Sequence, residues 1–391
     1  MADTLDSPGL IPARLRDRGG FALALAVFAL VLLAAVVAGG YFSASQEFQI
    51  GRGMRSLASG FYASEAGIRE VLNTWDPLVA GNLQPSESLL VGPVTLEGGG
   101  GYSAKVMRFG SGADSMKRYF YIETSGRPPG RTLGERRQAA VARARYPRLC
   151  CDAAAKVATS VESGGGAATI LDGFNATPMS WPASACVGVP AGNAPGVIVV
   201  RADSVERPNR VKGDPVNIAV DSALTAANVF DFTDISYAEL VALADHTFSS
   251  LNFSNSVPSL DANGRCDRTK PLNWGAPDSP GHPCFNYFPI IHVSGDLHLN
   301  GSGRAQGILV VGGDLQITGP FDFYGILLVN DDLKISGPTQ VYGGAMVVGD
   351  VVFTGSNSTL RLSRCAVRRA ERLSNLTRPR ILSRRGWVEL F

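Results

Sequence analysis

Six cysteines and four histidines are the side chains of this 391-residue chain that could support specific chemistry. No two cysteines have the Cys-x-x-Cys spacing of a zinc site, and the sequence contains no His-Glu-x-x-His, Gly-x-Ser-x-Gly or glycine-rich phosphate loop. The histidines are His246, His282, His292 and His298. Their spacing indicates neither a catalytic base nor a metal ligand, so we expect no enzyme, no catalytic residue, no metal and no cofactor.

The cysteines are better explained as disulfide partners. Their number is even, and the topology derived below places all of them outside the cytoplasm, where disulfides form. Cys266 and Cys284 bracket a segment rich in Pro and Gly with few apolar side chains to hold it, so we predict that they pair. Closing a loop of that length stabilises by about 3 kcal/mol in the chain-entropy relation. For Cys186 the sequence favours Cys150 or Cys151, although the full connectivity stays open.

One segment has the length and composition of a membrane-spanning helix. Residues 21–40, from Phe21 to Gly40, carry no charge and would span about 30 Å, the thickness of the hydrocarbon layer. Arginines lie just before this segment, and the first charge after it is Glu47. The positive-inside rule therefore predicts a single-pass inner-membrane protein with a cytoplasmic N-terminus and the rest of the chain outside.

The residues before this segment run in the order Arg18, Gly19, Gly20, Phe21, with the small residues ahead of the apolar run. In a secretory signal the small residues follow that run. The order here resembles the type III signal of prepilins. The resemblance implies a leader of residues 1–20, cleavage by a prepilin peptidase between Gly20 and Phe21, and methylation of the new N-terminus. The alternative is an uncleaved membrane anchor.

The fifth residue of the mature chain would be Leu25. Major pilins usually carry a glutamate at this position. Its loss is typical of subunits that do not form the repeating shaft, such as PilX-like minor pilins and the tip pseudopilin of type II secretion. The resemblance therefore implies a subunit of low abundance.

The helix is predicted to continue well beyond the membrane, over residues 21–75. No proline lies between Pro12 and Pro77, and the apolar residues beyond Gly40 recur every three or four positions. A helix that ends near Asn73 would be a rod of about 80 Å. We expect its outer half to pack its apolar stripe on a globular domain. The stripe comprises Ile50, Met54, Leu57, Phe61, Ile68, Val71 and Trp75.

A short motif lies within this stripe. Ala63, Glu65, Ala66 and Gly67 belong to the run Phe-Tyr-Ala-Ser-Glu-Ala-Gly-Ile, which resembles the Ala-Glu-Ala-Gly-Ile signature that closes the N-terminal domain of PilX-like minor pilins. The resemblance covers roughly residues 15 to 75 and implies other pilins and a prepilin peptidase as partners. We expect Glu65 to pair with Arg69, four residues later on the same helical face.

The next two regions give weaker patterns. Residues 76–150 predict an antiparallel pilin-like sheet, with a crossing loop at 77–100 and strands at 102–107, 118–125 and 138–146. Residues 151–289 predict an irregular α+β region whose topology the sequence does not specify. Within it we expect a strand at 197–201 and a helix at 237–248 with Ser236 as its N-cap.

Residues 290–363 contain a repeat of eighteen residues. Asp296, Asp314, Asp332 and Asp350 are eighteen apart, and apolar residues recur at every second place after each of them. The period predicts a small β-solenoid with one coil per repeat, which resembles the coils of bactofilin-like polymers and hexapeptide-repeat proteins. Each aspartate is expected to bond to its own backbone in a turn. A calcium column is the alternative, and a hexapeptide-type acyltransferase that uses His292 or His298 is another.

The C-terminal region, residues 364–391, is strongly basic. It is expected to form a helix that caps the end of the solenoid, followed by a tail. The net charge of the whole chain is only +2, so the composition does not indicate nucleic acid as a partner. We interpret the local excess of arginine as solvated side chains.

Together these patterns predict an α+β fold. It comprises a long N-terminal transmembrane helix of the pilin type, an antiparallel pilin-like sheet and a small C-terminal β-solenoid with a helical tail. The expected function is that of a minor pilin-like subunit that assembles into or primes a type IV pilus-like filament, moving from the inner membrane to the cell surface. The alternatives are a type II secretion tip pseudopilin and a membrane-anchored surface adhesin whose ligand the sequence does not name.

Overall fold

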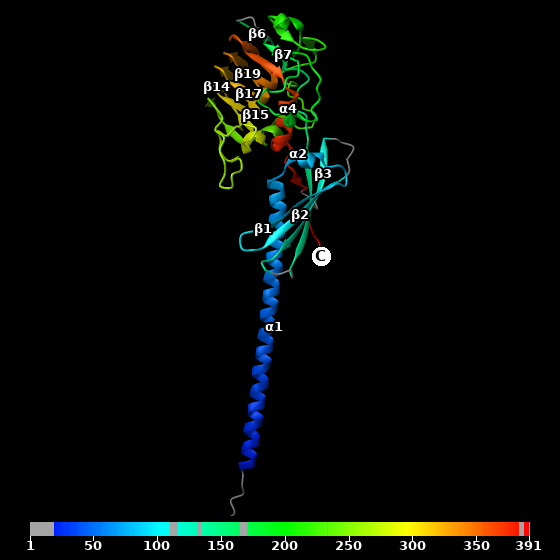
Figure 1. The fold of residues 1–391 in the computed structure, drawn as a ribbon, viewed down its shortest axis with the longest axis vertical. Coiled ribbons are helices and arrows are strands. Elements are labelled where there is room, and N and C mark those ends of the chain that lie inside the picture. The colour runs from blue at the N-terminus through cyan, green and yellow to red at the C-terminus, as the bar shows by residue number, and fades with distance from the viewer. Residues whose placement is uncertain are drawn as a thin grey trace, which may run out of the picture.

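The computed structural model describes residues 19–109, 116–130, 134–164, 170–232, 234–382 and 387–390. It consists of a helical rod, a small antiparallel sheet against the outer end of that rod, and a larger domain of stacked parallel strands beyond the sheet (Figure 1). The fold is α+β, with one long apolar helix and both antiparallel and parallel sheets.

The rod is a single helix, α1 (Gly19–Asn73), of 55 residues. It continues through Gly39, Gly40, Gly51 and Gly53, each of which weakens a helix by about 1 kcal/mol relative to alanine. The helix ends before Pro77, which begins α2 (Pro77–Asn82). The predicted end near Asn73 is confirmed.

The antiparallel sheet lies against the last turns of α1. Its strands are β1 (Ser88–Thr95), β2 (Gly101–Arg108), β3 (Lys117–Arg127), β4 (Arg136–Arg145), β22 (Arg380–Ile381) and β23 (Trp387–Leu390). The order is β1-β2-β3-β4-β22, with β23 also paired to β4. The prediction of a loop at 77–100 is wrong, because this stretch contains α2 and β1. Leu89 and Val91 of β1 pack against the sheet's core, which is apolar enough to order the stretch despite its Pro and Gly residues.

Strands from both ends of the chain complete this sheet. The chain leaves it after Arg145 and returns at Arg380, and Arg380 pairs with Arg143. Most of the described residues between these two points form the larger domain, which is therefore inserted between two neighbouring strands of the small sheet (Figure 1).

The larger domain contains two parallel sheets. The first is made of β5 (Ala155–Val157), β7 (Leu171–Asp172), β8 (Val197–Val199), β9 (Val211–Lys212), β10 (Ile218–Val220), β11 (His246–Phe248), β13 (Ile290–Val293), β15 (Arg304–Val311), β17 (Asp322–Val329), β19 (Gln340–Val347) and β21 (Thr359–Leu362). The second is made of β6 (Val161–Ser163), β12 (Leu251–Phe253), β14 (Leu297–Asn300), β16 (Leu315–Thr318), β18 (Leu333–Ser336) and β20 (Val351–Phe353). Most of their inward side chains form one buried apolar core.

The pairing of these strands follows the predicted spacing of eighteen. Leu315 pairs with Leu297 on one side and with Leu333 on the other, and all three side chains are fully buried. Gly307, Gly325 and Gly343 form a second column in the longer strands, each with a positive φ. A methyl group at Gly325 would collide with the carbonyl oxygen of Gly307, so the column requires glycine at this position.

The aspartate column bonds between repeats rather than within them. The Asp296 carboxylate accepts a hydrogen bond from the backbone N–H of Asp314 at 3.0 Å, and Asp314 and Asp332 accept in the same way from the next aspartate at 3.1 and 2.9 Å. The prediction that each aspartate bonds to its own backbone is therefore wrong. The reason is that stacked turns place the N–H of the next repeat within reach of each carboxylate. At the end of the column, the carboxylate of Asp350 accepts hydrogen bonds from the backbone N–H and the hydroxyl of Ser160.

Residues 151–289, whose topology could not be predicted, contribute strands to the same sheets out of chain order. β5 pairs with β19 and β6 with β20, so a segment that comes early in the chain extends the stack beyond its last repeat. At the other end β11 and β12 pair with β13 and β14. The predicted helix at 237–248 is shorter than expected. It is α3 (Tyr237–Val241), with the predicted capping box of Ser236 and Glu239, and its last residues form β11 instead.

Helix α4 (Arg364–Leu373) lies where the larger domain meets the small sheet (Figure 1). It packs across β15, β17 and β19 through Cys365, Ala366 and Ala370 rather than over the end of the stack. The expectation of an end cap is thus wrong, because the apolar face of α4 matches the apolar outer face of these strands. Five short 3₁₀ helices complete the described part: η1 (Ala183–Cys186), η2 (Ala202–Ser204), η3 (Pro208–Arg210), η4 (Pro283–Asn286) and η5 (Asn375–Thr377).

Candidate functional site

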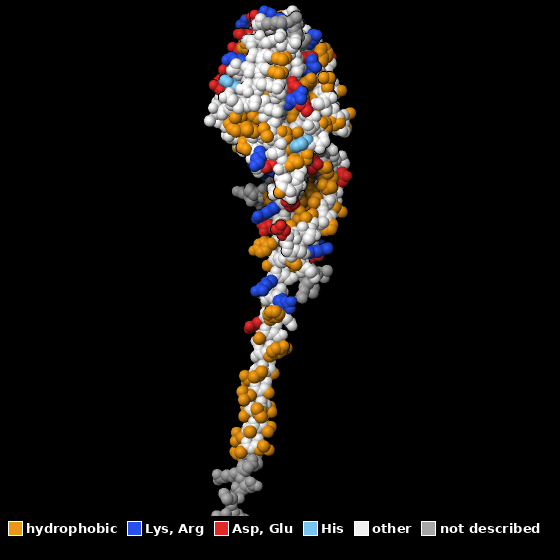
Figure 2. Space-filling model, turned by 60° about the vertical axis from the view of Figure 1, so that its left-hand side comes forward, with side chains coloured by type: hydrophobic (Ala, Val, Ile, Leu, Met, Phe, Trp, Pro, Cys, Tyr) orange, Lys and Arg blue, Asp and Glu red, His pale blue; other side chains and the backbone are white. Residues whose placement is uncertain are grey.

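The first candidate site is the protruding half of α1. Among the described residues, α1 is the one helix that is long and apolar enough to cross a membrane. No described part of the chain covers its most apolar stretch. Phe21 is 76% exposed and Leu25 is 54% exposed. Hydrophobic side chains surround the lower part of the rod, and charged ones begin only higher up (Figure 2). An apolar surface of this extent requires lipid or other helices around it.

The apolar stripe above the membrane segment divides into two parts. Ile68 and Val71 are buried against the small sheet, as predicted, but Ile50 and Met54 are 58% and 67% exposed. The prediction that the whole outer stripe packs on the chain's own domain is therefore wrong for its first half. The sheet is too short to reach these residues, so the exposed part of the stripe remains free to contact another molecule.

The predicted motif lies where α1 packs on the sheet. Ala63 is buried, and Gly67 allows the ring of Tyr102 to approach so closely that a methyl group would lie 2.7 Å from it. Between them, the hydroxyl of Ser64 lies 2.8 Å from that of Thr124 on β3, a partner that the sequence pattern did not reveal. The motif therefore provides close contact between helix and sheet.

The two charged members of this helix turn behave as expected. Glu65 accepts a hydrogen bond from Arg69 at 2.6 Å, which is the predicted pairing of residues four apart. Arg69 is largely exposed, so the pair contributes little to stability. Ala66 is partly buried beside it. This geometry gives Glu65 a structural role on the helix surface.

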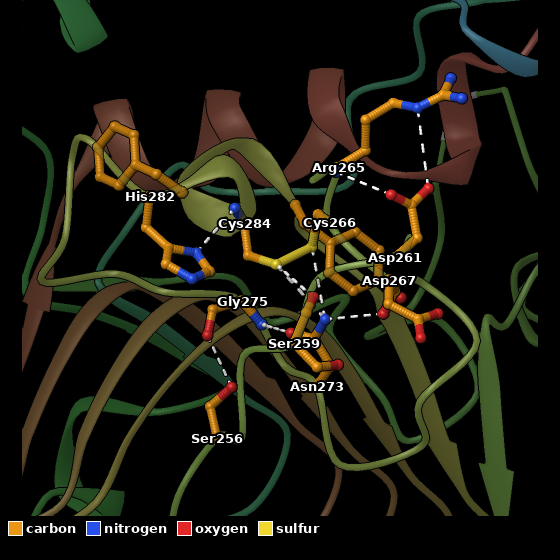
Figure 3. The surroundings of a disulfide bond; sticks show 12 residues. Ser256, Ser259, Asp261, Arg265, Cys266, Asp267, Asn273, Gly275, His282 and Cys284 are labelled. Carbon is orange, nitrogen blue, oxygen red and sulfur yellow. Dashed lines mark hydrogen bonds and ion pairs between the residues drawn. A yellow bond between two sulfur atoms is a disulfide. The ribbon is translucent and has the colours of Figure 1, made fainter. Parts of the chain in front are cut away.

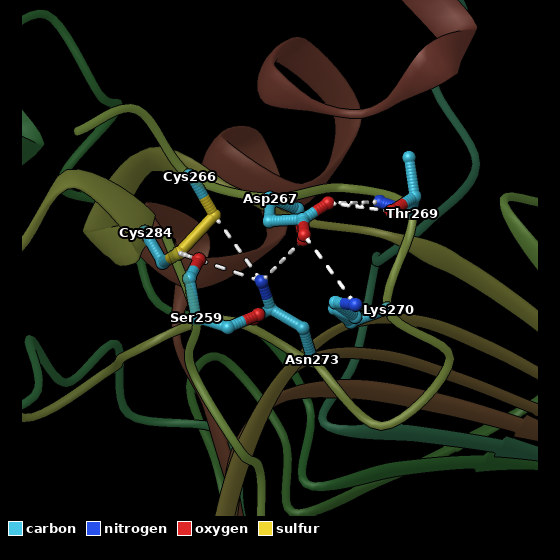
Figure 4. Close-up of polar contacts among 7 residues, drawn as sticks. All are labelled: Ser259, Cys266, Asp267, Thr269, Lys270, Asn273 and Cys284. Carbon is cyan, nitrogen blue, oxygen red and sulfur yellow. Dashed lines mark hydrogen bonds and ion pairs between the residues drawn. A yellow bond between two sulfur atoms is a disulfide. The ribbon is translucent and has the colours of Figure 1, made fainter. Parts of the chain in front are cut away.

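The second candidate site is the disulfide-bonded loop of the larger domain. The structure contains the pair predicted from the sequence, Cys266–Cys284, with Cα atoms 4.9 Å apart (Figure 3). The side-chain amide of Asn273 points at the bridge, 3.4 and 3.5 Å from the two sulfur atoms, and donates to the carbonyl oxygen of Asp267 at 2.8 Å (Figure 4). Asn273 is fully buried, so this amide fixes the loop from inside.

This loop also contacts the rod. Arg265, immediately before the bridge, lies 3.8 Å from Asp261 (Figure 3). It also lies 3.6 Å from Glu70 of α1. Both contacts are exposed and therefore weak individually. They nevertheless place the disulfide-bonded loop next to the outer end of α1.

The remaining cysteines pair differently from the prediction. Cys186 joins Cys365 across 179 residues, with Cα atoms 5.2 Å apart, and Cys150 joins its neighbour Cys151. The expected partner for Cys186 was therefore wrong. Sequence proximity favoured Cys150 or Cys151, whereas the packing of α4 on the sheet brings Cys365 to η1.

Two of the histidines have structural partners. The Nδ1 atom of His282 accepts a hydrogen bond from the backbone N–H of Cys284 at 3.0 Å and so caps η4. The ring of His246 is buried, with its Nε2 atom 3.2 Å from the hydroxyl of Tyr287, and burial lowers the pKa of this imidazole. Across the residues that the structure describes, no group of three or more His, Cys, Asp or Glu side chains could hold a metal ion.

Comparison with known proteins does not assign a family. No family model matches the chain, and no curated protein matches it. Among solved structures, the chain aligns with the competence-associated pilin ComZ from Thermus thermophilus. The alignment has 14% identity over 86% of this chain and 98% of that one, with a TM-score of 0.25. A score this low supports no argument about fold or function.

Proposed function

We propose that this chain is a minor pilin-like subunit that assembles into or primes a type IV pilus-like filament. The observation that carries the proposal is the continuity of α1. One unbroken helix has an uncovered apolar half of membrane length and an outer end fixed to a folded sheet. A helix of this kind can move from lipid into a bundle of similar helices without refolding, because both surroundings satisfy the same apolar surface.

Two further features support the finer role. The run from Arg18 to Phe21 has the residue order of a prepilin leader. Leu25 provides no carboxylate for the N-terminal amine of a neighbouring subunit, and an unpaired charge among packed helices is costly. We therefore propose low abundance, with the two parallel sheets forming a short β-solenoid displayed at the surface.

Processing and assembly test the proposal together. Gly20→Asp should leave the full-length precursor in the membrane and abolish its entry into sheared filaments, because the peptidase would no longer meet glycine at the cleavage site. Ser7→Asp adds the same charge within the leader and should be processed normally. N-terminal sequencing of membrane-extracted protein, and mass spectrometry of sheared filaments, provide the two measurements.

The results separate this role from its alternatives. A mature chain that starts at Phe21 and forms a small fraction of the filament supports a minor subunit. An intact N-terminus in cells with an active prepilin peptidase would exclude a pilin and favour a membrane-anchored adhesin. If this chain formed most of the filament mass, the role of a minor subunit would be excluded, and so would the inference of low abundance from Leu25. Loss of protein secretion on deletion, without loss of pili, would assign the chain to a type II secretion tip.

A further inference from the structure

A cavity of about 370 Å³ lies between the small sheet and the larger domain, beside α4. Five arginines line it: Arg118, Arg148, Arg364, Arg368 and Arg372. The acidic side chains in the lining are Glu371 and Asp152. Five positive charges less two negative ones leave an excess of three positive charges around this one pocket, which is partly open to solvent.

The cavity collects these arginines from separate parts of the chain. Arg364, Arg368 and Arg372 are four residues apart on α4 and therefore share one face of that helix. Arg118 comes from β3, and Arg148 follows β4. Like charges four apart on a helix repel one another, so this row destabilises α4 unless an opposite charge lies beside it.

The residue next to this row shows that an arginine of α4 can be satisfied without an anion. The guanidinium of Arg369 lies 4.5 to 5.3 Å from the ring centres of Trp181, Phe285 and Phe288 and donates to Asn286 at 2.7 Å. Aromatic rings and a hydrogen-bond acceptor therefore surround this guanidinium. The arginines of the cavity have fewer such partners.

The internal acceptors of the cavity are largely in use. Arg364 donates to the carbonyl oxygen of Gly192 at 2.6 Å and to that of Asn193 at 3.3 Å, and Arg118 donates to Gly81. Within the described part of the chain, no hydrogen bond or ion pair within 4.0 Å involves the guanidinium group of Arg148, Arg368 or Arg372, although the backbone carbonyl of Arg372 accepts from the hydroxyl of Thr377 at 2.7 Å.

Glu371 offsets only part of the positive charge of this row, although it attracts Arg148, Arg368 and Arg372 electrostatically. Its carboxylate accepts a hydrogen bond from the backbone N–H of Leu149 at 2.7 Å, and burial raises its pKa to about 7. Burial, with repulsion from neighbouring arginines, lowers the pKa of Arg372 below its usual range. The positive charges of the cavity therefore repel one another, and a bound anion would reduce this repulsion.

We propose that this cavity binds a phosphoryl anion carrying two or more negative charges, as inorganic phosphate or as the phosphate group of a small molecule. The planar fork of a guanidinium matches two oxygens of a phosphate, and several forks can share one tetrahedral group. A phosphoryl group carries about two charges near neutral pH, whereas a carboxylate carries one, so it offsets more of the excess in the same volume.

The position of the cavity excludes the headgroups of the anchoring membrane as the source of this group. From Gly40 to Asn73 the helix extends about 50 Å beyond the membrane segment at 1.5 Å per residue. Three of the arginines that line the cavity belong to α4, and α4 lies beyond that outer end of α1 (Figure 1). The ligand must therefore come from the surrounding solution.

The test uses the full-length chain in a neutral detergent. Thermal unfolding, followed by tryptophan fluorescence, is measured against rising pyrophosphate or inorganic phosphate at constant ionic strength set with potassium chloride. Arg368→Gln and Arg372→Gln each remove one cavity arginine. Arg201→Gln is the matched control, because it removes the same charge at an exposed arginine of the larger domain that pairs with Asp203.

We expect saturable stabilisation of the wild-type chain by either anion, at least tenfold weaker binding in the two cavity variants, and wild-type binding in Arg201→Gln. Without anion, the cavity variants should unfold at the same temperature as the wild type or higher, since they remove repulsion. A lower unfolding temperature with unchanged anion binding would show that these arginines are structural and overturn the proposal. Equal weakening in all three variants, or a response to chloride of the same size, would overturn it as well.

Discussion

Replacing Leu315 by alanine should destabilise the larger domain, whereas the same replacement at Gln316 should not. Leu315 is fully buried between Leu297 and Leu333 in the stacked column of β16. Gln316 is the next residue on the same strand and points to the opposite face, where it is only half-buried. The two positions are adjacent on one strand but face opposite sides of the sheet, so the comparison tests the effect of burial in the core.

The size of the effect follows from the packing. Truncating a leucine in a close-packed core removes the transfer free energy of the deleted atoms and leaves a cavity whose lining loses contacts. Together these effects cost about 3 kcal/mol for Leu→Ala. The column is rigid on both sides because Leu297 and Leu333 are held by parallel pairing, so little relaxation is available. For a domain of roughly 200 residues this corresponds to a fall in the unfolding temperature of about 6 to 12 °C. For Gln316→Ala we expect a change below about 0.5 kcal/mol.

Trp274 provides the assay. Its ring is fully buried in the same core and stacks on Phe253 with ring centres 3.8 Å apart, so its fluorescence reports the unfolding of this domain. Denaturant unfolding of the full-length chain in detergent should show a lower midpoint for Leu315→Ala at unchanged slope. Equal shifts for the two variants, or a loss below about 1 kcal/mol for Leu315→Ala, would refute the inference that this strand faces a dry, rigid core.

Three further predictions follow from the described contacts. Replacing Cys266 and Cys284 together by serine should cost about 3 kcal/mol and open the loop to protease; mapped cleavage elsewhere would contradict its role as the bond that holds the loop. Gly67→Ala should lower the unfolding temperature, because the added methyl group would collide with the ring of Tyr102 on β2. Gly51→Ala adds a methyl group in open space and should raise the helicity of α1. A stabilising effect of both substitutions would be inconsistent with close packing at Gly67. Burial raises the pKa of Glu371 from 4.5 to about 7, so between these pH values the folded state holds a proton that the unfolded state has lost. The free energy of unfolding should therefore fall by up to about 3 kcal/mol from pH 4.5 to 7, and Glu371→Gln should flatten this slope. An unchanged slope would count against the shift in pKa.

The sequence predicts best where the information is local or periodic. Helix α1 ends where expected because one apolar face and the absence of proline specify it. The register of β14, β16 and β18 follows from an eighteen-residue period that aligns identical side chains. The Cys266–Cys284 bond spans a short segment that lacks other means of support.

The features that the sequence did not predict depend on contacts between distant segments. β5 and β6 are strands of only three residues, and they form because the last repeat offers an open edge with which they can pair. Cys186 meets Cys365 only after α4 has packed on the sheet. The arginine-lined cavity likewise joins β3, the segment after β4, and α4, and no spacing along the chain relates these positions.

In the export that we propose for this chain, the insertion of the larger domain between β4 and β22 has a consequence for the order of events. β22 and β23 lie at the end of the chain and pair with β4, which is made more than two hundred residues earlier. Until those last residues have crossed the membrane, β4 has an unpaired edge, and such edges readily pair with other chains. Folding of the inserted domain brings Arg145 and Arg380 together and so shortens the search for the final strands. We therefore expect a newly exported chain to be vulnerable to wrong pairing during this interval, and a shielding partner during translocation would act at the edge of β4.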